Sequence, residues 1–344
     1  MKVLYLIQAH KSPEQIYRLV QTIKKSSPES HILVSHDFTA CNLDITPLQI
    51  PGVDVIKKDA QGVRGDFSLV QAYLDAVDWL FSHNIEFDWL INLCGQSYPT
   101  QPLSQIENFL AETNYDGFLD YFKALSNYES NPWGIREGRN RYLYKYWHSG
   151  IQLSSCQKKL LKPFRMLLNN SQPFIKIDDF YQFSIGTRAF STPFNQNFVC
   201  YGGSFFTTLS KKCVRYIHDF SKKHPSLIRY YERTCNPDES FIQTVLCNSK
   251  LFVLCNDCKR YIDFSNSEDY SRPRTLTFKD YTALIKDDIH FARKFDLAQD
   301  SIILDMLDAK INTLIEEQFV NKQFQSDAFR NSTSNFNDSA AQIL

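Results

Sequence analysis

The stretch Trp89-Leu90-Ile91-Asn92-Leu93-Cys94, which runs into Gly95-Gln96-Ser97-Tyr98-Pro99, decides the fold class of this chain. Its first six residues are apolar with one exception, which is typical of a strand buried on both faces of a parallel sheet. The glycine and the proline that follow predict a turn at the carboxyl end of this strand. Ligands of open parallel sheets bind beyond such ends, so we expect the Gly95–Ser97 turn to lie beside a binding site.

Strand and helix patterns alternate around this stretch through the first 120 residues. Further strands are predicted at Val3–Gln8, His31–Ser35, Val53–Ile56 and Asp116–Asp120, with one helix beginning at Pro13 and another over Ser68–Phe81. The helical segments carry apolar residues three and four positions apart, as a helix with one buried face requires. The alternation predicts an α/β fold with a mostly parallel central sheet flanked by helices.

The composition excludes several classes of protein. Hydrophobic residues make up 43% of the 344 residues, enough for one large or two fused domains. Lys+Arg and Asp+Glu both number 38, so no broad basic field exists to hold nucleic acid, and we expect no nucleic-acid partner. The first apolar run is too short for a signal peptide or a membrane span, and no later stretch reaches spanning length without charges. We therefore expect a cytoplasmic protein that is at most peripheral to the inner face of a membrane.

Nine cysteines are scattered from Cys41 to Cys258. Their odd number and mostly apolar surroundings predict reduced thiols and no disulfide framework. Cys255 and Cys258 form the only CxxC spacing, and neither a second pair nor a histidine cluster accompanies them. We expect no metal site here.

Candidate acid–base chemistry lies in Asn236–Leu246, where a proline and two acids precede an apolar run at helical spacing. Pro237 suits the first position of a helix, and acids suit its first turn. We therefore expect Asp238 and Glu239 at the start of a buried helix, where a carboxylate can accept a proton from a bound hydroxyl. The alternative is that both acids only cap the helix.

Two polar residues lie just beyond the ends of the first two predicted strands. His10 and Asp37 therefore belong to the sheet edge where ligands bind, although solvated loop ends are the alternative. No GxGxxG follows the first strand and no GxxxxGK[ST] occurs. An ordinary dinucleotide site and an ATPase-type phosphate loop are accordingly not expected.

Cations and aromatic residues form two further candidate groups. Arg272, Arg274, Arg293 and Lys294 are close enough in sequence to converge, and fixed positive charge suits a leaving diphosphate. Trp133 with Arg136, Arg139 and Arg141 can stack on a sugar or hold an acidic group. For both groups, ordinary solvated or loop-packing side chains are the alternative, and the sequence does not choose.

The candidate stretches resemble motifs of the core-2/I-branching enzyme and peptide O-xylosyltransferase family of glycosyltransferases. The matching pieces, in family order, are Ile7–Lys11, His36-Asp37, Gly65–Ala72, Leu90–Pro99, Gly202–Ser204, Pro237–Phe241, Arg260–Asp263 and Phe291–Asp296. Each piece is a weak signal alone, but chance would rarely place so many in the same order.

The resemblance implies a GT-A type nucleotide-sugar fold and inverting transfer from a UDP-sugar without a metal cofactor. The absence of any Asp-x-Asp triplet agrees with this. We expect a single domain over residues 1–320, with a nucleotide-binding half at about 1–120 and an acceptor and catalytic half at about 121–300. Residues 321–344 are rich in Ser, Asn and Gln, which predicts a disordered tail.

The resemblance also assigns roles to single residues. It makes Glu239 the general base, with Asp238 beside it. The residues it places on the nucleotide sugar are His10, Asp37, Gly65, Arg272, Arg274, Arg293 and Lys294, where Arg274 is an alternate for Arg272. Gly203, Ser204 and Arg141 are expected to bind the acceptor.

The chain departs from the family pattern at Arg64-Gly65-Asp66, Ser97 and Phe205, which affects the sugar pocket rather than the fold. Its length, without anchor or stem, implies a bacterial-type member that acts on a cell-surface glycan or a lipid-linked precursor. Three functions are considered: UDP-GlcNAc-dependent β-1,6-type transfer, UDP-xylose transfer to a protein serine, and glycan or nucleotide binding without catalysis. The presence of Glu239, Arg293 and Lys294 argues against the third.

Overall fold

The computed structural model describes residues 1–58, 61–179, 181–265 and 272–317 of the chain. These residues form two compact units, each assembled from separate stretches. The first unit comprises Met1–Tyr17, Glu29–Gly95 and Glu112–Lys259, and the second comprises Arg18–Pro28, Gln96–Ala111 and the described part of Arg260–Leu344. The predicted tail at 321–344 lies outside the described residues, and the single domain over 1–320 stays a prediction.

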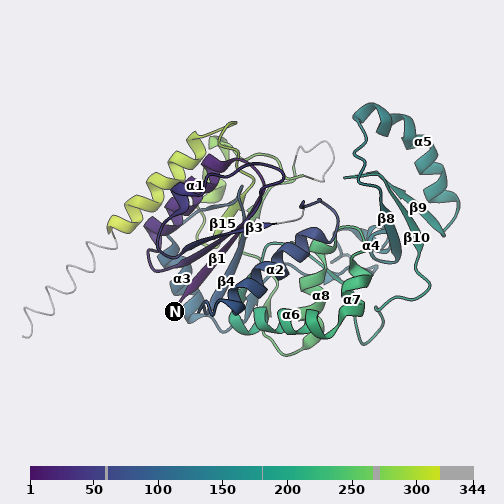
Figure 1. Cartoon of the computed structure of the whole chain (residues 1–344), viewed down its shortest axis with the longest axis horizontal. Helices are drawn as coiled ribbons and strands as arrows, with labels where there is room; N and C mark the ends of the chain where they lie inside the picture. Colours follow the sequence, from purple (N-terminus) through teal and green to yellow (C-terminus); the bar gives the residue numbers. More distant parts are fainter. Residues whose placement is uncertain (59–60, 180, 266–271, 318–344) are drawn as a thin grey trace, which may run out of the picture. The chain divides into compact units, whose positions relative to one another are not determined.

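A seven-stranded sheet organises the first unit (Figure 1). Its strands, in spatial order, are β13 (Leu254–Cys255), β6 (Gly117–Phe118), β12 (Thr208–Ser210), β4 (Trp89–Cys94), β1 (Val3–Ala9), β2 (His31–Asp37) and β3 (Val53–Lys58). β12 runs antiparallel to both of its neighbours, and every other neighbouring pair is parallel. The prediction of a mostly parallel central sheet is confirmed, although the strand predicted at Asp116–Asp120 is only two residues long.

The central strands are apolar because both faces of the sheet are covered. Leu4 and Leu6 in β1 and Leu90 in β4 are fully buried. They share one core with α2 (Ser68–Ser82), α6 (Lys211–Lys223) and α8 (Phe241–Ser249), whose apolar residues pack against the same strands. Burial on this scale stabilises a fold by about 1.5–3 kcal/mol for each large apolar side chain. The helix predicted over Ser68–Phe81 is confirmed as α2. Its apolar period also placed Leu69 on the buried face, but Leu69 is only half-buried.

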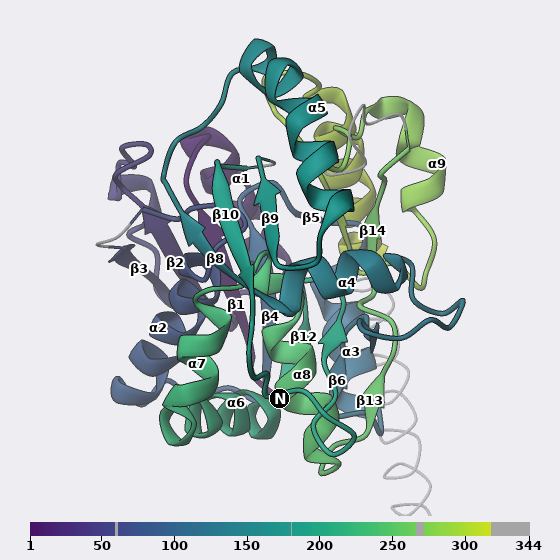
Figure 2. The ribbon, with the colours of Figure 1, turned by 90° about the vertical axis from the view of Figure 1, so that its right-hand side faces the viewer.

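The first unit also carries a smaller antiparallel sheet (Figure 2). Its strands are β8 (Tyr144–His148), β10 (Ser184–Arg188) and β9 (Ile175–Asp178), in that order. α4 (Gly134–Tyr142) leads into β8, and α5 (Ser155–Ser171) precedes β9. α5 has no buried side chain, and polar contacts tie it to β9: Asn169 Nδ2 donates to the carbonyl of Ile177 at 2.9 Å, and Ile177 N donates to Asn169 Oδ1 at 2.8 Å. The remaining elements are η1 (Thr46–Leu48), α7 (Pro225–Tyr231), η2 (Pro237–Glu239) and the strand pair β7 (Phe122–Lys123) and β11 (Tyr201–Gly202).

The second unit is built around a three-stranded sheet. Its strands are β14 (Arg260–Ile262), β15 (Phe291–Arg293) and β5 (Tyr98–Pro99). Most of α3 (Leu103–Glu112), η3 (Phe278–Asp280), α9 (Tyr281–Leu284) and a helix that includes residues 302–317 belong to it. α1 (Pro13–Ser26) begins in the first unit and continues into the second, where Arg18 forms ion pairs with Asp305 and Asp308.

Candidate active site

The two candidate acids lie in a short turn that is separate from the helix behind them. The predicted helix over Asn236–Leu246 is wrong in this respect: Pro237–Glu239 form η2, and α8 begins only at Phe241. Asn236 adopts a left-handed backbone with φ of 50°, and the carbonyl of Glu239 accepts a hydrogen bond from Gly203 N at 2.8 Å. Because that carbonyl is bonded outside the helix, the chain turns at Ser240 and does not continue one helical ladder.

Glu239 is paired with an arginine from the last turn of α4. Arg141 Nη1 lies 2.5 Å from Glu239 Oε2, and Arg141 Nε donates to Glu137 Oε1 at 2.8 Å. The guanidinium also lies over the Trp133 ring, 4.2 Å from its centroid. The side chain of Arg141 is 17% exposed and that of Glu239 is 34% exposed. The arginine is therefore held on three sides, and it orients a carboxylate that solvent still reaches.

Asp238 has a different environment from its neighbour. Its Oδ1 is buried and has no hydrogen-bond partner among the described residues. Burial disfavours the charged carboxylate and raises the pKa of Asp238, and the adjacent charge of Glu239 raises it further. Asp238 therefore holds a proton more readily than a solvated aspartate does.

The predicted Gly202–Ser204 element lies against the backbone of Glu239. A Cβ on Gly203 would lie 1.8 Å from the carbonyl oxygen of Asp120, so only glycine fits this close approach. The carbonyl of Ser204 accepts a hydrogen bond from Gln243 Nε2 at 2.5 Å, which ties the element to α8. The structure thus brings Gly203 and Ser204 to the same place as the candidate acids.

Gly65 reaches the same turn from the other side. Asn236 N donates to the carbonyl of Gly65 at 2.9 Å, directly before the turn that carries the acids. Gly65 has φ of 87°, and a Cβ there would lie 2.4 Å from the Tyr181 ring. Arg64 lies over that same ring, 4.8 Å from its centroid. The departure from the family pattern at Arg64 therefore coincides with a cation–aromatic contact beside the candidate acids.

His10 and Asp37 lie at the carboxyl ends of β1 and β2, which pair in parallel. Asp37 is almost fully buried, and its carboxylate accepts hydrogen bonds from Thr39 N at 3.0 Å and Gly62 N at 2.7 Å. Burial lowers the pKa of His10, Lys11 lowers it further, and Asp37 opposes them. Asp37 therefore shapes the loops at the sheet edge while it stays close enough to act on the charge of His10.

Arg272 and Arg274, which the sequence left as alternatives, have different contacts in the second unit. Arg274 forms ion pairs with Asp263 at 2.6 Å and with Asp280 at 2.5 Å. Arg272 is exposed and forms no ion pair with a described residue. Arg274 is thus engaged by two carboxylates of its own unit.

Lys294 lies where three distant motifs of the second unit meet. The carbonyl of Lys294 accepts a hydrogen bond from Leu276 N at 2.8 Å. The next residue, Phe295, exchanges hydrogen bonds with Gln96: its N–H donates at 3.0 Å, and its carbonyl accepts from Gln96 Nε2 at 3.1 Å. The predicted turn after β4, the segment that follows Arg272, and the Arg293-Lys294 pair are therefore neighbours in the fold.

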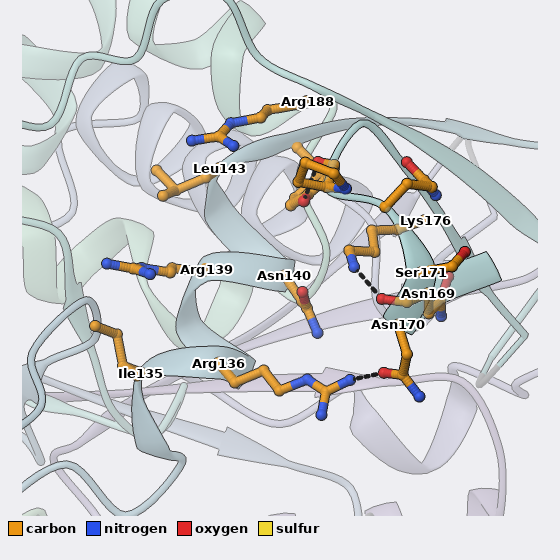
Figure 3. A pocket seen from close by; sticks show the side chains of 13 residues that line it. Ile135, Arg136, Arg139, Asn140, Leu143, Asn169, Asn170, Ser171, Lys176 and Arg188 are labelled. Carbon is orange, nitrogen blue, oxygen red and sulfur yellow. Dashed lines mark hydrogen bonds between the residues drawn. The ribbon is translucent and has the colours of Figure 1, made fainter. Parts of the chain in front are cut away.

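A cavity of about 660 Å³ lies elsewhere in the first unit, between α4, the end of α5 and the small sheet (Figure 3). Arg136, Arg139, Lys176 and Arg188 line it. None of the residues predicted to bind the donor or the acceptor does so. Sequence reasoning noted Arg136 and Arg139 but missed Lys176 and Arg188, which lie 37 or more positions further along the chain and carry no local signal.

Three further expectations concern thiols, metals and membranes. All nine cysteines are free thiols, and the pKa of Cys255 is raised by burial. Within the described ranges, no group of three or more His, Cys, Asp or Glu side chains is placed to hold a metal ion. No helix in the described part of the chain is both long enough and apolar enough to span a membrane.

Comparisons with known proteins agree with the motifs. A family profile described as Core-2/I-Branching enzyme matches residues 5–287. β-Glucuronosyltransferase GlcAT14A of Arabidopsis thaliana is 24% identical over 247 residues, which cover 71% of this chain and 47% of that protein. Xylosyltransferase oxt of Drosophila melanogaster is 22% identical over 261 residues, which cover 75% of this chain and 23% of that protein. The match therefore spans less than half the length of either relative.

A solved structure of the galactosyltransferase LgtC, in complex with donor and acceptor sugar analogs, aligns with 85% of this chain and 86% of its own. The sequence identity is 10% and the TM-score is 0.35.

Proposed function

The chain belongs to the Core-2/I-branching enzyme family, and from this membership we propose that it is an inverting glycosyltransferase of GT-A type. It moves a sugar, N-acetylglucosamine in the first instance, from a UDP-sugar to a hydroxyl of a glycan. A cell-surface or lipid-linked saccharide is the proposed acceptor. The observation that supports this most directly is the pairing of Glu239 with Arg141, because it holds one carboxylate in a defined orientation with solvent access.

Glu239 is the proposed general base. The acceptor oxygen attacks the anomeric carbon, its proton passes to the Glu239 carboxylate, and the bond between the sugar and the diphosphate breaks with its electrons going to UDP. A positioned base of this kind contributes about a hundredfold to ten-thousandfold in rate. Arg141 is a positioning residue in this scheme, since it contacts Glu239 and fixes the direction in which the free oxygen points.

Cations stabilise the departing UDP in the proposal. Lys294, Arg293 and Arg272 take this role, with Arg274 as the alternate for Arg272. Fixed guanidinium and ammonium groups stabilise charge that develops on a leaving phosphate. We propose that they act without a divalent metal, a role that a Lewis acid fills in other enzymes. This part depends on the family resemblance and on the absence of an Asp-x-Asp triplet from the sequence.

The donor is open between a small number of sugars. UDP-xylose with a protein serine as acceptor is the second candidate, and the name of the oxt relative favours the xylosyl donor. The name of the GlcAT14A relative adds a glucuronosyl donor to the panel. A candidate from another class is a protein that binds a glycan or a nucleotide without catalysis.

The decisive experiment measures UDP release from UDP-GlcNAc, UDP-xylose and UDP-glucuronic acid in excess chelator, with a mixed glycan acceptor pool. Turnover that survives chelation and falls at least a hundredfold in Glu239→Gln supports the proposal. Glu129→Gln, which changes an exposed glutamate in the same way, is the matched control. Donor binding without transfer to any acceptor would favour the non-catalytic alternative.

A further inference from the structure

The cavity between α4, α5 and the small sheet has a one-sided charge. Arg136 and Arg139 come from α4, Lys176 from β9 and Arg188 from β10. No carboxylate is among the thirteen described residues that line it, whereas Asn140, Asn169, Asn170 and Ser171 supply further polar groups. Figure 3 shows Arg139 and Arg188 extending in the same direction on either side of Leu143. Like charges that line one cavity repel one another, and an anion bound in the cavity would reduce this repulsion.

Lys176 is the least expected of these cations. It is only 9% exposed, and its Nζ donates to the carbonyl of Asn169. No described carboxylate forms an ion pair with it, although buried lysines are rarely found without one. Burial lowers the pKa of Lys176, and the nearby charge of Arg136 lowers it further. A buried ammonium in this state gains stability when a negative group enters the cavity beside it.

The arginines of the cavity are available for such a group. Arg136 donates to the Asn170 side chain, and this contact leaves other guanidinium donors unused. Arg139 and Arg188 are exposed and form no ion pair with the described residues. Guanidinium groups present paired donors that match the oxygens of a carboxylate or a phosphate. The cavity volume lies within the range of sites for ligands of one or two sugar rings.

We propose that this cavity binds the anionic group, carboxylate or phosphate, of a saccharide, and that it anchors a negatively charged acceptor. The proposal rests on the glycosyltransferase function, which it deepens by naming the acceptor class. α4 links the two places: Arg139 lines the cavity, and Arg141, two residues later, contacts Glu239. The same short helix therefore presents cations both to the anion and to the base.

The test measures binding of four probes in the absence of donor, by isothermal titration calorimetry on the full chain. The probes are a uronic-acid tetrasaccharide, its carboxyl-reduced neutral form, a phosphorylated tetrasaccharide and inorganic phosphate. Arg139→Gln/Arg188→Gln removes two exposed cations of the cavity. Lys159→Gln/Lys162→Gln, which changes two exposed lysines of α5 outside the cavity, is the matched control.

We expect at least one charged tetrasaccharide to bind at least tenfold more tightly than the neutral form. Its affinity should fall about tenfold for each arginine removed in the cavity variant, and should not change in the control variant. The charged probe that binds better identifies the source of the anion. Equal binding of charged and neutral probes, equal binding by both variants, or binding of inorganic phosphate alone would overturn the proposal. The rate of UDP release measured without acceptor should be the same in both variants as in the unaltered protein. A failed binding test with intact, Glu239-dependent transfer would remove the anion site and leave the proposed function standing.

Discussion

Arg141 Nη1 lies 2.5 Å from Glu239 Oε2, and the two residues are 98 positions apart in the chain. The same guanidinium bonds Glu137 one turn earlier in α4 and lies over Trp133. Three contacts on one side chain leave it little freedom, so the carboxylate that it holds is oriented before any substrate arrives. The sequence suggested that Arg141 contacts the acceptor, whereas the structure places its guanidinium on the candidate base.

Replacing Arg141 should therefore affect chemistry more than binding. We expect Arg141→Gln to lower kcat by roughly tenfold to a hundredfold, because Glu239 loses its orientation, while KM for the acceptor changes less. Arg141→Lys should restore part of kcat, since an ammonium still pairs with the carboxylate but does not form both bonds. Steady-state kinetics of both variants check this, with thermal melts to confirm folding. An increase in acceptor KM at unchanged kcat would instead assign Arg141 to acceptor binding.

Asp238 should make stability depend on pH in an unusual direction. Its pKa is raised to about 7 in the folded chain by burial and by Glu239, above the value of about 3.9 for an unfolded aspartate. The folded state then binds more protons than the unfolded state between these values, so stability falls as pH rises through this window. We would measure the free energy of unfolding in urea at pH 5 and at pH 8. Between these pH values it should fall less in Asp238→Asn than in the wild-type protein, by about 1–3 kcal/mol. A wild-type protein that gains stability from pH 5 to pH 8 relative to Asp238→Asn would contradict this.

The close approach at Gly203 predicts a large cost for the smallest substitution. A Cβ at Gly203 would lie 1.8 Å from the carbonyl oxygen of Asp120, so Gly203→Ala should destabilise the protein by about 3 kcal/mol or more. Gly134→Ala is the control, because its Cβ would meet nothing within 4 Å and only its φ of 69° is unfavourable. We expect that control to cost about 1 kcal/mol. Denaturant titrations compare the two, and equal costs would show that the chain moves freely at Gly203.

Replacing Arg272 and replacing Arg274 should cause different defects, one in activity and the other in stability. Arg274→Gln leaves Asp263 and Asp280 without their shared partner, so we expect a lower melting temperature. Arg272→Gln removes an exposed side chain without a described ion pair, so the melting temperature should stay the same. If Arg272 contacts the diphosphate, its variant should raise KM for the UDP-sugar or lower kcat by about tenfold. Unchanged kinetics in Arg272→Gln would remove it from the donor site.

The sequence by itself determined the local structure and the family. Strands such as Val3–Ala9 and Trp89–Cys94 are buried on both faces, and their continuous apolar runs record this directly. The helix at Ser68–Ser82 was predictable from its apolar residues, whose period is set by the one face that the helix buries. Short motifs in a fixed order were enough to indicate the family that the profile match then showed.

Only the tertiary structure decided what the charged side chains do. The break at Ser240 depends on a hydrogen bond from Gly203, and the engagement of Arg274 depends on Asp263 and Asp280. The basic cavity collects α4, β9 and β10 side chains, and nothing in any one of these segments indicates the others. The partner of a charged side chain can lie at any distance along the sequence. The apolar period of a strand or helix, in contrast, is visible in the local sequence of that element. Hence the sequence alone predicted the sheet, and the fold was needed to show that Arg141 holds Glu239.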